Sequence, residues 1–162
     1  MSNEWVKKLP IDTATSIATK FSLDHRLVLA IIQQESGGQS FACRFEPQYK
    51  WLYNVNSLAK SVGCTVNTMT VMQMTSWGLM QVMGAVAYED GFNPRQYVSQ
   101  LVLPHIGIEY GCRRLEKLWK KYNTINEVIS AYNAGSLIYD ISGKYNNQNY
   151  VDSVLGYMVQ VP

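Results

Sequence analysis

The most apolar helix-forming stretch of the chain carries a carboxylate near its end. In residues 27–38 (LVLAIIQQESGG), the positions three, four and seven residues before Glu35 are isoleucine, isoleucine and valine. Residues at these separations lie on one face of an α-helix, so Glu35 continues an apolar stripe. Gly37 and Gly38 are typical of the end of a helix. The stretch therefore predicts a core helix that places a glutamate on its buried face.

Much of the remaining sequence predicts short helices bounded by capping residues, prolines and glycines. Asp12 is expected to cap a first helix, and Pro104 to open a long one that ends near Tyr122. Thr124 and Glu127 have the spacing of a capping box at the start of the next helix. No alternating pattern lasts long enough to build a large sheet. The sequence predicts a mainly α fold with little or no sheet.

Length and charge bound the organisation of the chain. Its 162 residues are 47% hydrophobic and 16% charged, with a net charge of +2. A chain of this length buries roughly 70% of the surface that its unfolded form exposes, which is enough for one domain without a metal or disulfide. The positive charge is too weak to indicate a nucleic-acid partner, and the run LVLAII is too short to span a membrane. We expect one monomeric domain over residues 1–162.

The cysteines argue against a disulfide framework and against a zinc site. Cys43, Cys64 and Cys112 are odd in number and show no CxxC spacing. A Cys43–Cys64 disulfide stays open, and buried thiols are the favoured alternative.

Carboxylate acid–base catalysis is the mechanism that the sequence favours, because it lacks the motifs of the other common mechanisms. The chain has two histidines, His25 and His105, and no GxSxG, phosphate-binding loop or metal-ligand motif. No cofactor is therefore expected. Among the carboxylates Glu35 is placed best, because burial would raise its pKa toward the value of about 6–7 that suits a general acid. Periodicity alone leaves open that Glu35 borders the helix end and points into solvent.

Three separated motifs occur in a defined order along the chain. ES at residues 35–36 ends the apolar helix, SWGLMQV follows at 76–82, and AYNAG at 131–135 precedes YV at 150–151. Together they resemble the soluble lytic transglycosylases and the related goose-type lysozymes, including members encoded by phages. The resemblance runs from about Phe21 to Val151. It implies a lysozyme-like domain in which a helical bundle surrounds a substrate cleft.

The resemblance also implies roles for individual residues. Glu35 matches the catalytic acid/base of the family, and Tyr132 matches a tyrosine whose hydroxyl is hydrogen-bonded near that carboxylate. Residues 78–81 match a segment that walls the cleft. The positions expected to bind substrate are Ser76, Met80, Gln81, Tyr132, Asn133 and Tyr150.

The implied reaction cleaves the β-1,4 bond between N-acetylmuramic acid and N-acetylglucosamine in peptidoglycan glycan strands. Glu35 would protonate the bond and then accept a proton from the muramic acid 6-hydroxyl, which closes a 1,6-anhydro ring. Effective molarities of roughly 10⁵ M or more allow such an intramolecular attack to outcompete water. Lysozyme-type hydrolysis with Glu46 or Asp90 holding a water stays open, and Glu89 is a further candidate for the same role. An inactive wall-binding or structural module of a phage or secretion machine is the alternative from another class.

Two regions depart from a minimal family pattern or suggest other functions. Glu35 and Gly78 lie 43 positions apart, and the extra sequence includes the aromatic residues of segment 41–56. Packing is favoured over stacking on sugars for these aromatics. In residues 113–121 (RRLEKLWKK), we expect the basic side chains to form a solvated helix face and Trp119 to point inward.

The N-terminal sequence bears on where the protein acts. Residues 1–16 lack the continuous apolar core of a signal peptide. We therefore expect a protein made in the cytoplasm that reaches the cell wall after release, as a phage lysis enzyme does, or as part of a virion.

Overall fold

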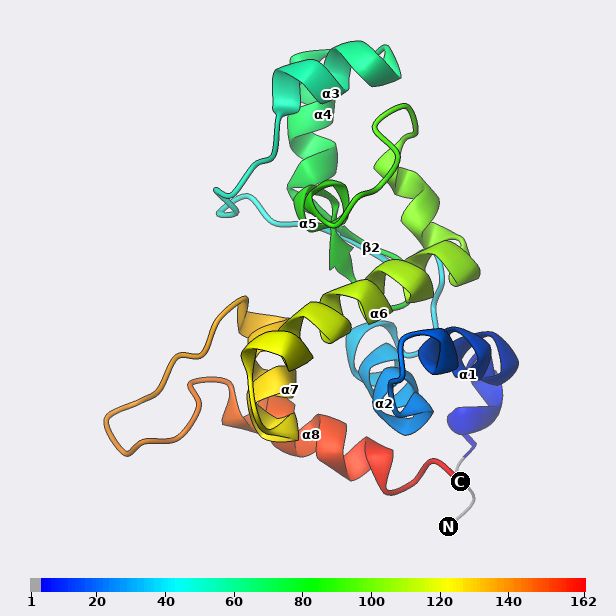
Figure 1. Ribbon diagram of the computed structural model, residues 1–162, viewed down its shortest axis with the longest axis vertical. Helices are drawn as coiled ribbons and strands as arrows, with labels where there is room; N and C mark the ends of the chain where they lie inside the picture. Colours follow the sequence, from blue (N-terminus) through cyan, green and yellow to red (C-terminus); the bar gives the residue numbers. More distant parts are fainter. Residues whose placement is uncertain (1–3) are drawn as a thin grey trace. The chain divides into compact units, whose positions relative to one another are not determined.

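The computed structural model describes residues 4–162 and is mainly helical (Figure 1). The chain forms two compact units. The described residues up to Gly38 join Cys112–Pro162 in the first unit, and Gln39–Gly111 forms the second. A mainly α, lysozyme-like fold is thereby confirmed. Residues 1–3, where the stretch compared with a signal peptide begins, lie outside the described part of the chain.

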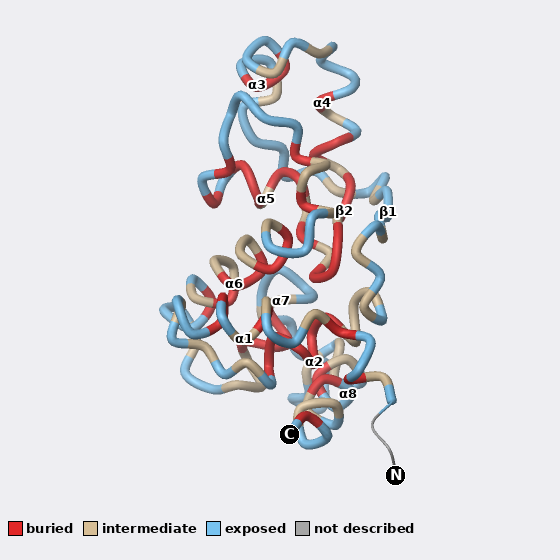
Figure 2. The backbone as a smooth tube through the Cα atoms, turned by 90° about the vertical axis from the view of Figure 1, so that its right-hand side faces the viewer, coloured by how far each residue is buried: buried red, intermediate tan, exposed pale blue. Residues whose placement is uncertain are grey.

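The first unit is built around helix α2 (His25–Ser36). Its other helices are η1 (Val6–Lys8), α1 (Ile11–Lys20), the end of α6 (Pro104–Lys121), α7 (Ile125–Ala134) and α8 (Gln148–Met158). Residues 27–32 of α2 are all almost fully buried, and α2 packs against α1 and α8 (Figure 2). A helix that is apolar on every side must be surrounded by others. The apolar run thus determines which helix lies at the centre of this unit.

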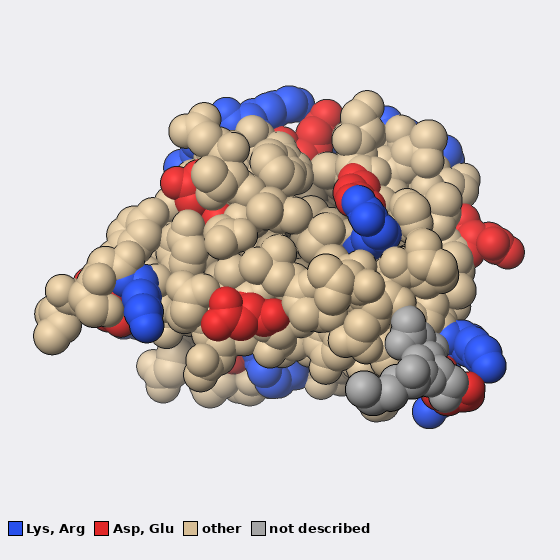
Figure 3. All heavy atoms as spheres, turned by 90° about the horizontal axis from the view of Figure 1, so that it is seen from below, with Lys and Arg blue, Asp and Glu red and all other residues tan. Residues whose placement is uncertain are grey.

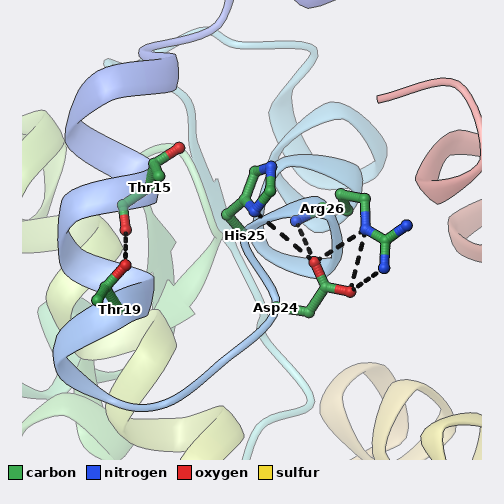
Figure 4. Close-up of polar contacts among 5 residues, drawn as sticks. All are labelled: Thr15, Thr19, Asp24, His25 and Arg26. Carbon is green, nitrogen blue, oxygen red and sulfur yellow. Dashed lines mark hydrogen bonds and ion pairs between the residues drawn. The ribbon is translucent and has the colours of Figure 1, made fainter. Parts of the chain in front are cut away.

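Capping residues fix where α2 begins and ends. The Asp24 carboxylate accepts a hydrogen bond from the Arg26 backbone N–H at 2.9 Å and is paired with the Arg26 guanidinium (Figure 4). These bonds to Arg26 hold the pKa of the Asp24 carboxyl below its ordinary value. At the other end, Gly37 adopts a left-handed conformation with φ of 59°, which glycine tolerates without steric cost. The predicted glycine stop is confirmed.

The predicted caps at two other helix starts have different outcomes. The capping box of Thr124 and Glu127 is present at the start of α7. Asp12, in contrast, does not cap α1, because the N-cap position is occupied by Pro10. The Asp12 carboxylate lies in the first turn, where it favours the helix through the dipole.

The second unit contains a three-stranded antiparallel sheet with short helices around it. Its elements are β1 (Cys43–Phe45), α3 (Val55–Val62), α4 (Val66–Gln73), β2 (Thr75–Trp77), β3 (Val82–Met83), α5 (Gly84–Glu89), η2 (Val98–Val102) and the start of α6. Strand β2 lies between β1 and β3, and Ser76 pairs with both Arg44 and Met83. The strands have two or three residues each, too few to produce a visible alternation in the sequence.

A glycine makes the turn between β2 and β3 sterically feasible. Gly78 has a φ of 71°, and a Cβ atom built there would lie 2.1 Å from the Leu101 carbonyl oxygen. Any side chain would therefore displace backbone. The first residue of the GLMQ sequence is required by the fold itself.

Exposure corrects two packing predictions. Trp119 is 37% exposed, because it lies beside the buried row of Leu115 and Leu118 on α6 and not within it. Segment 41–53, which we call the aromatic loop, leaves most of its large apolar side chains in solvent, including Trp51. The prediction that these aromatics pack is wrong for most of them.

Charge, cysteines and membrane crossing complete the description of the chain. On the face drawn in Figure 3, basic and acidic side chains are scattered among uncharged ones. Lys117 and Lys120 are exposed, as predicted. No disulfide joins Cys43, Cys64 and Cys112 (all described residues), and Cys43 is exposed where a buried thiol was favoured. Within residues 4–162, no helix combines the length and apolarity needed to cross a bilayer.

Candidate active site

Glu35 lies on the last turn of α2 and is half-buried. The buried side chains of Ile31 and Ile32 fix the rotation of this turn. Ser36, the second residue of the ES motif, fastens the helix end: its hydroxyl donates to the Ile32 carbonyl at 3.1 Å and accepts from the Gly38 N–H at 3.3 Å. The Glu35 carboxylate is therefore carried on a rigid, capped helix end. The solvent-pointing alternative for Glu35 does not describe this structure.

Tyr150 contacts the Glu35 carboxylate directly. Its hydroxyl donates a hydrogen bond of 2.5 Å to Glu35 Oε1. Tyr150 is half-buried on the first turn of α8, and the fully buried Val151 and Val154 on the same helix anchor this turn in the first unit. A short bond from a hydroxyl to a carboxylate is among the stronger hydrogen bonds in proteins. Two residues that are far apart in sequence thus form one polar pair.

Both tyrosines of the predicted site stay protonated. Burial raises the pKa of Tyr150 far above its ordinary value of 10, and the nearby Glu35 carboxylate raises it further. Burial and Glu35 also raise the pKa of Tyr132 well above 10. A phenol with a raised pKa is a hydrogen-bond donor and not a proton acceptor at neutral pH. Within this trio, the group suited to exchange protons is the Glu35 carboxyl.

An asparagine links the helices that carry the two tyrosines. Asn147, at the N-cap of α8, donates from Nδ2 to the Ser130 carbonyl and to Asn133 Oδ1, both at 3.0 Å. Its Oδ1 accepts from the Ser130 hydroxyl at 2.7 Å. Ser130 is fully buried on α7. The side chain of Asn147 therefore ties α7, which carries Tyr132, to the turn of α8 that carries Tyr150.

The predicted site residues of the second unit form their own hydrogen-bond network. Gln81 Nε2 donates to the Gly78 carbonyl at 2.9 Å and to the Ala42 carbonyl at 3.1 Å. Its Oε1 accepts from the buried Ser76 hydroxyl at 2.9 Å. Gln81 also has a φ of 47°, which is uncommon for a residue with a side chain and is often found at functional sites. These bonds join the β2–β3 turn to the start of the aromatic loop.

Met80 fills an internal position of the same unit. Its side chain is fully buried, and a Cβ atom added to Gly111 on α6 would lie 2.3 Å from Met80 Sδ. Only a glycine at position 111 allows the thioether to pack so closely against α6. Substrate contact by Met80 stays a prediction, and the structure gives its side chain a packing role.

Comparison with known proteins decides the family of the chain. The model of the transglycosylase SLT domain matches residues 12–150. The chain belongs to the SLT family. The match covers both compact units and all three motifs. The SLT domain is of the peptidoglycan lytic transglycosylase type, and it acts on peptidoglycan. Nothing in a search of curated proteins matches the chain.

Three other carboxylates of this SLT domain are candidates from the sequence for a second catalytic group. Glu46 accepts a 2.5 Å hydrogen bond from Arg44 Nε in an ion pair. Asp90 is buried at the C-cap of α5, whereas its neighbour Glu89 is exposed. All three belong to the second unit, whereas Glu35 belongs to the first.

Among the described residues, no group of three His, Cys, Asp or Glu side chains is arranged to hold a metal ion.

The Asn147 link in this SLT domain was missed by sequence reasoning. Its one signal is local: an asparagine three residues before Tyr150 is a typical N-cap. Its partners Ser130 and Asn133 lie 17 and 14 positions earlier, and no spacing rule connects them. Asn133, predicted to face substrate, is exposed and accepts one of these bonds.

Proposed function

We propose that the chain cleaves the β-1,4 bond between N-acetylmuramic acid and N-acetylglucosamine by non-hydrolytic transglycosylation, with Glu35 as acid and then base. One observation carries this proposal: Glu35 is half-buried on a capped helix end and accepts a hydrogen bond from a tyrosine that cannot take its proton. A single positioned carboxyl that can exchange protons is what this reaction requires.

The proposed reaction moves one proton out of Glu35 and one back into it. The protonated carboxyl donates to the glycosidic oxygen, and the bond between that oxygen and C1 of the muramic acid breaks. The muramic acid 6-hydroxyl oxygen then attacks C1 and gives its proton to the Glu35 carboxylate. The products are a free 4-hydroxyl on N-acetylglucosamine and a 1,6-anhydro ring. No water is consumed, so no second carboxylate is needed to position one.

Tyr150 supports both steps without exchanging a proton. Its hydrogen bond to Oε1 orients the carboxyl and stabilises the charge that remains after the first proton transfer. Tyr132 supplies a second neutral hydroxyl near the same carboxylate.

The predicted substrate-binding residues of the second unit act in this proposal through the backbone they hold. The amide of Gln81 is engaged by Ser76, Gly78 and Ala42, so it fixes the shape of turn 78–81. The backbone of this turn then contacts the sugar chain, with Met80 packed beneath it. Asn133, which is exposed at the end of α7, contributes a polar side chain to the substrate.

Mass spectrometry of the products from purified peptidoglycan tests the proposal. We expect muropeptides that lack one water and carry no reducing muramic acid. Reducing ends with an added water would instead establish hydrolysis, and Glu46 and Asp90 would then be substituted in turn.

The Glu35→Gln variant tests the assignment of the catalytic residue. It keeps the size of the side chain and removes its acid–base function. We expect a folded protein, by circular dichroism, with product formation reduced by a factor of about a hundred to ten thousand, the usual contribution of a general acid–base group. Near-normal clearing of peptidoglycan by this variant would show that another group does the chemistry.

A further inference from the structure

The aromatic loop exposes more apolar surface than its length explains. Phe41 and Trp51 are 77% and 75% exposed. Phe45, Leu52 and Tyr53 are also exposed. Isolated apolar residues on a surface are ordinary, but several within one short segment usually mark a contact with another molecule. The stretch that could have packed in the core is instead displayed on the second unit.

This exposure does not arise from a loosely attached segment. Strand β1, inside the loop, pairs with β2. The loop end is held by Gln73, a fully buried side chain of α4, whose Oε1 accepts from the Tyr53 N–H and whose Nε2 donates to the Tyr53 carbonyl, both at 2.7 Å. The Glu46 N–H donates to the Met74 carbonyl at 2.8 Å. The backbone is therefore fixed before any ligand arrives, which lowers the entropy lost on binding.

Two aromatic rings in the loop support each other. Tyr49 and Trp51 form an edge-to-face pair with ring centroids 5.5 Å apart and an interplanar angle of 72°. Such a pair restricts the rotation of the indole ring. Trp51 nevertheless keeps three quarters of its surface accessible. The result is a flat, oriented and solvent-facing aromatic surface.

The start of the loop is bonded to the β2–β3 turn. The Ala42 carbonyl accepts from the Gly78 N–H at 2.7 Å and from Gln81 Nε2 at 3.1 Å. In the proposed function this turn contacts the sugar chain, so a glycan bound there runs over the same unit as the aromatic loop. Arg44 is paired with Glu46, and the exposed Lys50 is the basic group on the loop that suits the carboxylates of peptidoglycan.

We propose that the Tyr49–Trp51 pair is a glycan-binding platform on which a pyranose ring of the peptidoglycan strand stacks. The C–H groups on one face of a sugar ring pack against the flat indole, while its hydroxyl and acetamido groups at the rim stay hydrated. Flat aromatic area, and not apolar area alone, is the property that this occupant needs. The inference rests on the proposed function for its substrate and adds a binding surface that the chemical step does not use.

Binding is measured on the Glu35→Gln background, so that the strand is held without being cleaved. The ligand is glycan strands freed of stem peptides by an amidase, and titration gives the Kd. Trp51→Ala is expected to raise the Kd roughly threefold to tenfold, the range that aromatic stacking energies give. Trp51→Phe keeps a flat ring and should retain most of the affinity, whereas Trp51→Leu keeps only apolar area and should not. Tyr97→Ala removes an exposed ring elsewhere in the second unit and is the matched control.

Four outcomes would overturn the platform. The first is an unchanged Kd in Trp51→Ala, and the second is no glycan binding by the Glu35→Gln parent. The third is equal affinity of Trp51→Leu and Trp51→Phe, which indicates a plain hydrophobic contact. The fourth is Trp51-dependent binding to phosphatidylglycerol and phosphatidylethanolamine vesicles without glycan dependence, which assigns the loop to a membrane surface.

Kinetics with Glu35 present separate this inference from the proposed function. Trp51→Ala should raise KM by the same factor and leave kcat unchanged, because uniform binding is lost. If products prove hydrolytic while Trp51→Ala still weakens binding, the mechanism fails and the platform stands. If anhydro products form and Trp51 has no effect on KM, the platform fails and the mechanism stands.

Discussion

The Glu35–Tyr150 pair defines what the site can do at the scale of single residues. A carboxyl can give and regain a proton at neutral pH, and a buried phenol cannot. In the proposed function, proton exchange is therefore assigned to Glu35 and orientation of the carboxyl to Tyr150. The apolar stripe before Glu35 indicated the first residue, and only the fold identifies how the second contacts it.

Replacing Tyr150 with phenylalanine removes one oxygen and keeps the ring. We expect kcat to fall about tenfold to a hundredfold, because the carboxyl loses the bond that orients it. The donor also favours the ionised carboxylate, so its loss should move the alkaline limb of the rate–pH profile to higher pH. Steady-state rates across pH, with Tyr97→Phe as the control, measure both effects. An unchanged profile with normal kcat would mean that Tyr150 serves only to pack α8.

At the scale of elements, the Asn147 link determines how α8 meets α7. Asn147→Ala should leave the buried Ser130 hydroxyl without its acceptor and cost about 1–3 kcal/mol of unfolding free energy. It should also lower kcat, since Tyr150 lies three residues farther along α8. The exposed neighbour Asn149→Ala is the matched control, and urea denaturation gives the stabilities.

A double variant separates the hydrogen bond from general damage to α8. Ser130→Ala combined with Asn147→Ala removes both polar partners, so much of the stability lost in Asn147→Ala should return. Equal destabilisation of the single and double variants would contradict a specific role for this pair.

Local chemistry explains which elements were predicted from the sequence. The ends of α2 and α7 depend on Gly37 and on the Thr124–Glu127 box, residues adjacent to the backbone groups they satisfy. The sheet was not foreseen, since β3 has two residues and pairs by tertiary contacts. The exposure of Trp51 could not be predicted either, because the presence of an aromatic residue in a sequence does not reveal whether its side chain is buried or faces solvent. Non-local partners, such as those of Asn147 and Gln81, leave no trace in spacing.

At the scale of the whole molecule, the two tyrosines near Glu35 should make the free energy of unfolding depend on pH in the alkaline range. Their pKa values are raised above 10 in the folded chain, so the unfolded chain ionises first as the pH rises. Their contribution is complete below about pH 10 and is lost above it. Above that value we expect the free energy of unfolding to fall by about 1.4 kcal/mol per pH unit for each tyrosine. Urea denaturation at several alkaline pH values measures this slope, and Tyr150→Phe should reduce it. Identical slopes for the two proteins would contradict the raised pKa of Tyr150.

The position of Tyr150 along the chain also determines when the Glu35–Tyr150 hydrogen bond can form during synthesis. Its carboxylate partner was synthesised 115 residues earlier, and α2 is covered by α8 in the folded unit. Contacts this distant in sequence form late and slow folding, because a long loop must close first. A ribosome-bound chain that ends before Tyr150 therefore has the Glu35 carboxyl but not the hydroxyl that donates a hydrogen bond to it. If the proposed function holds, we expect activity to begin only after the last helix has emerged from the ribosome.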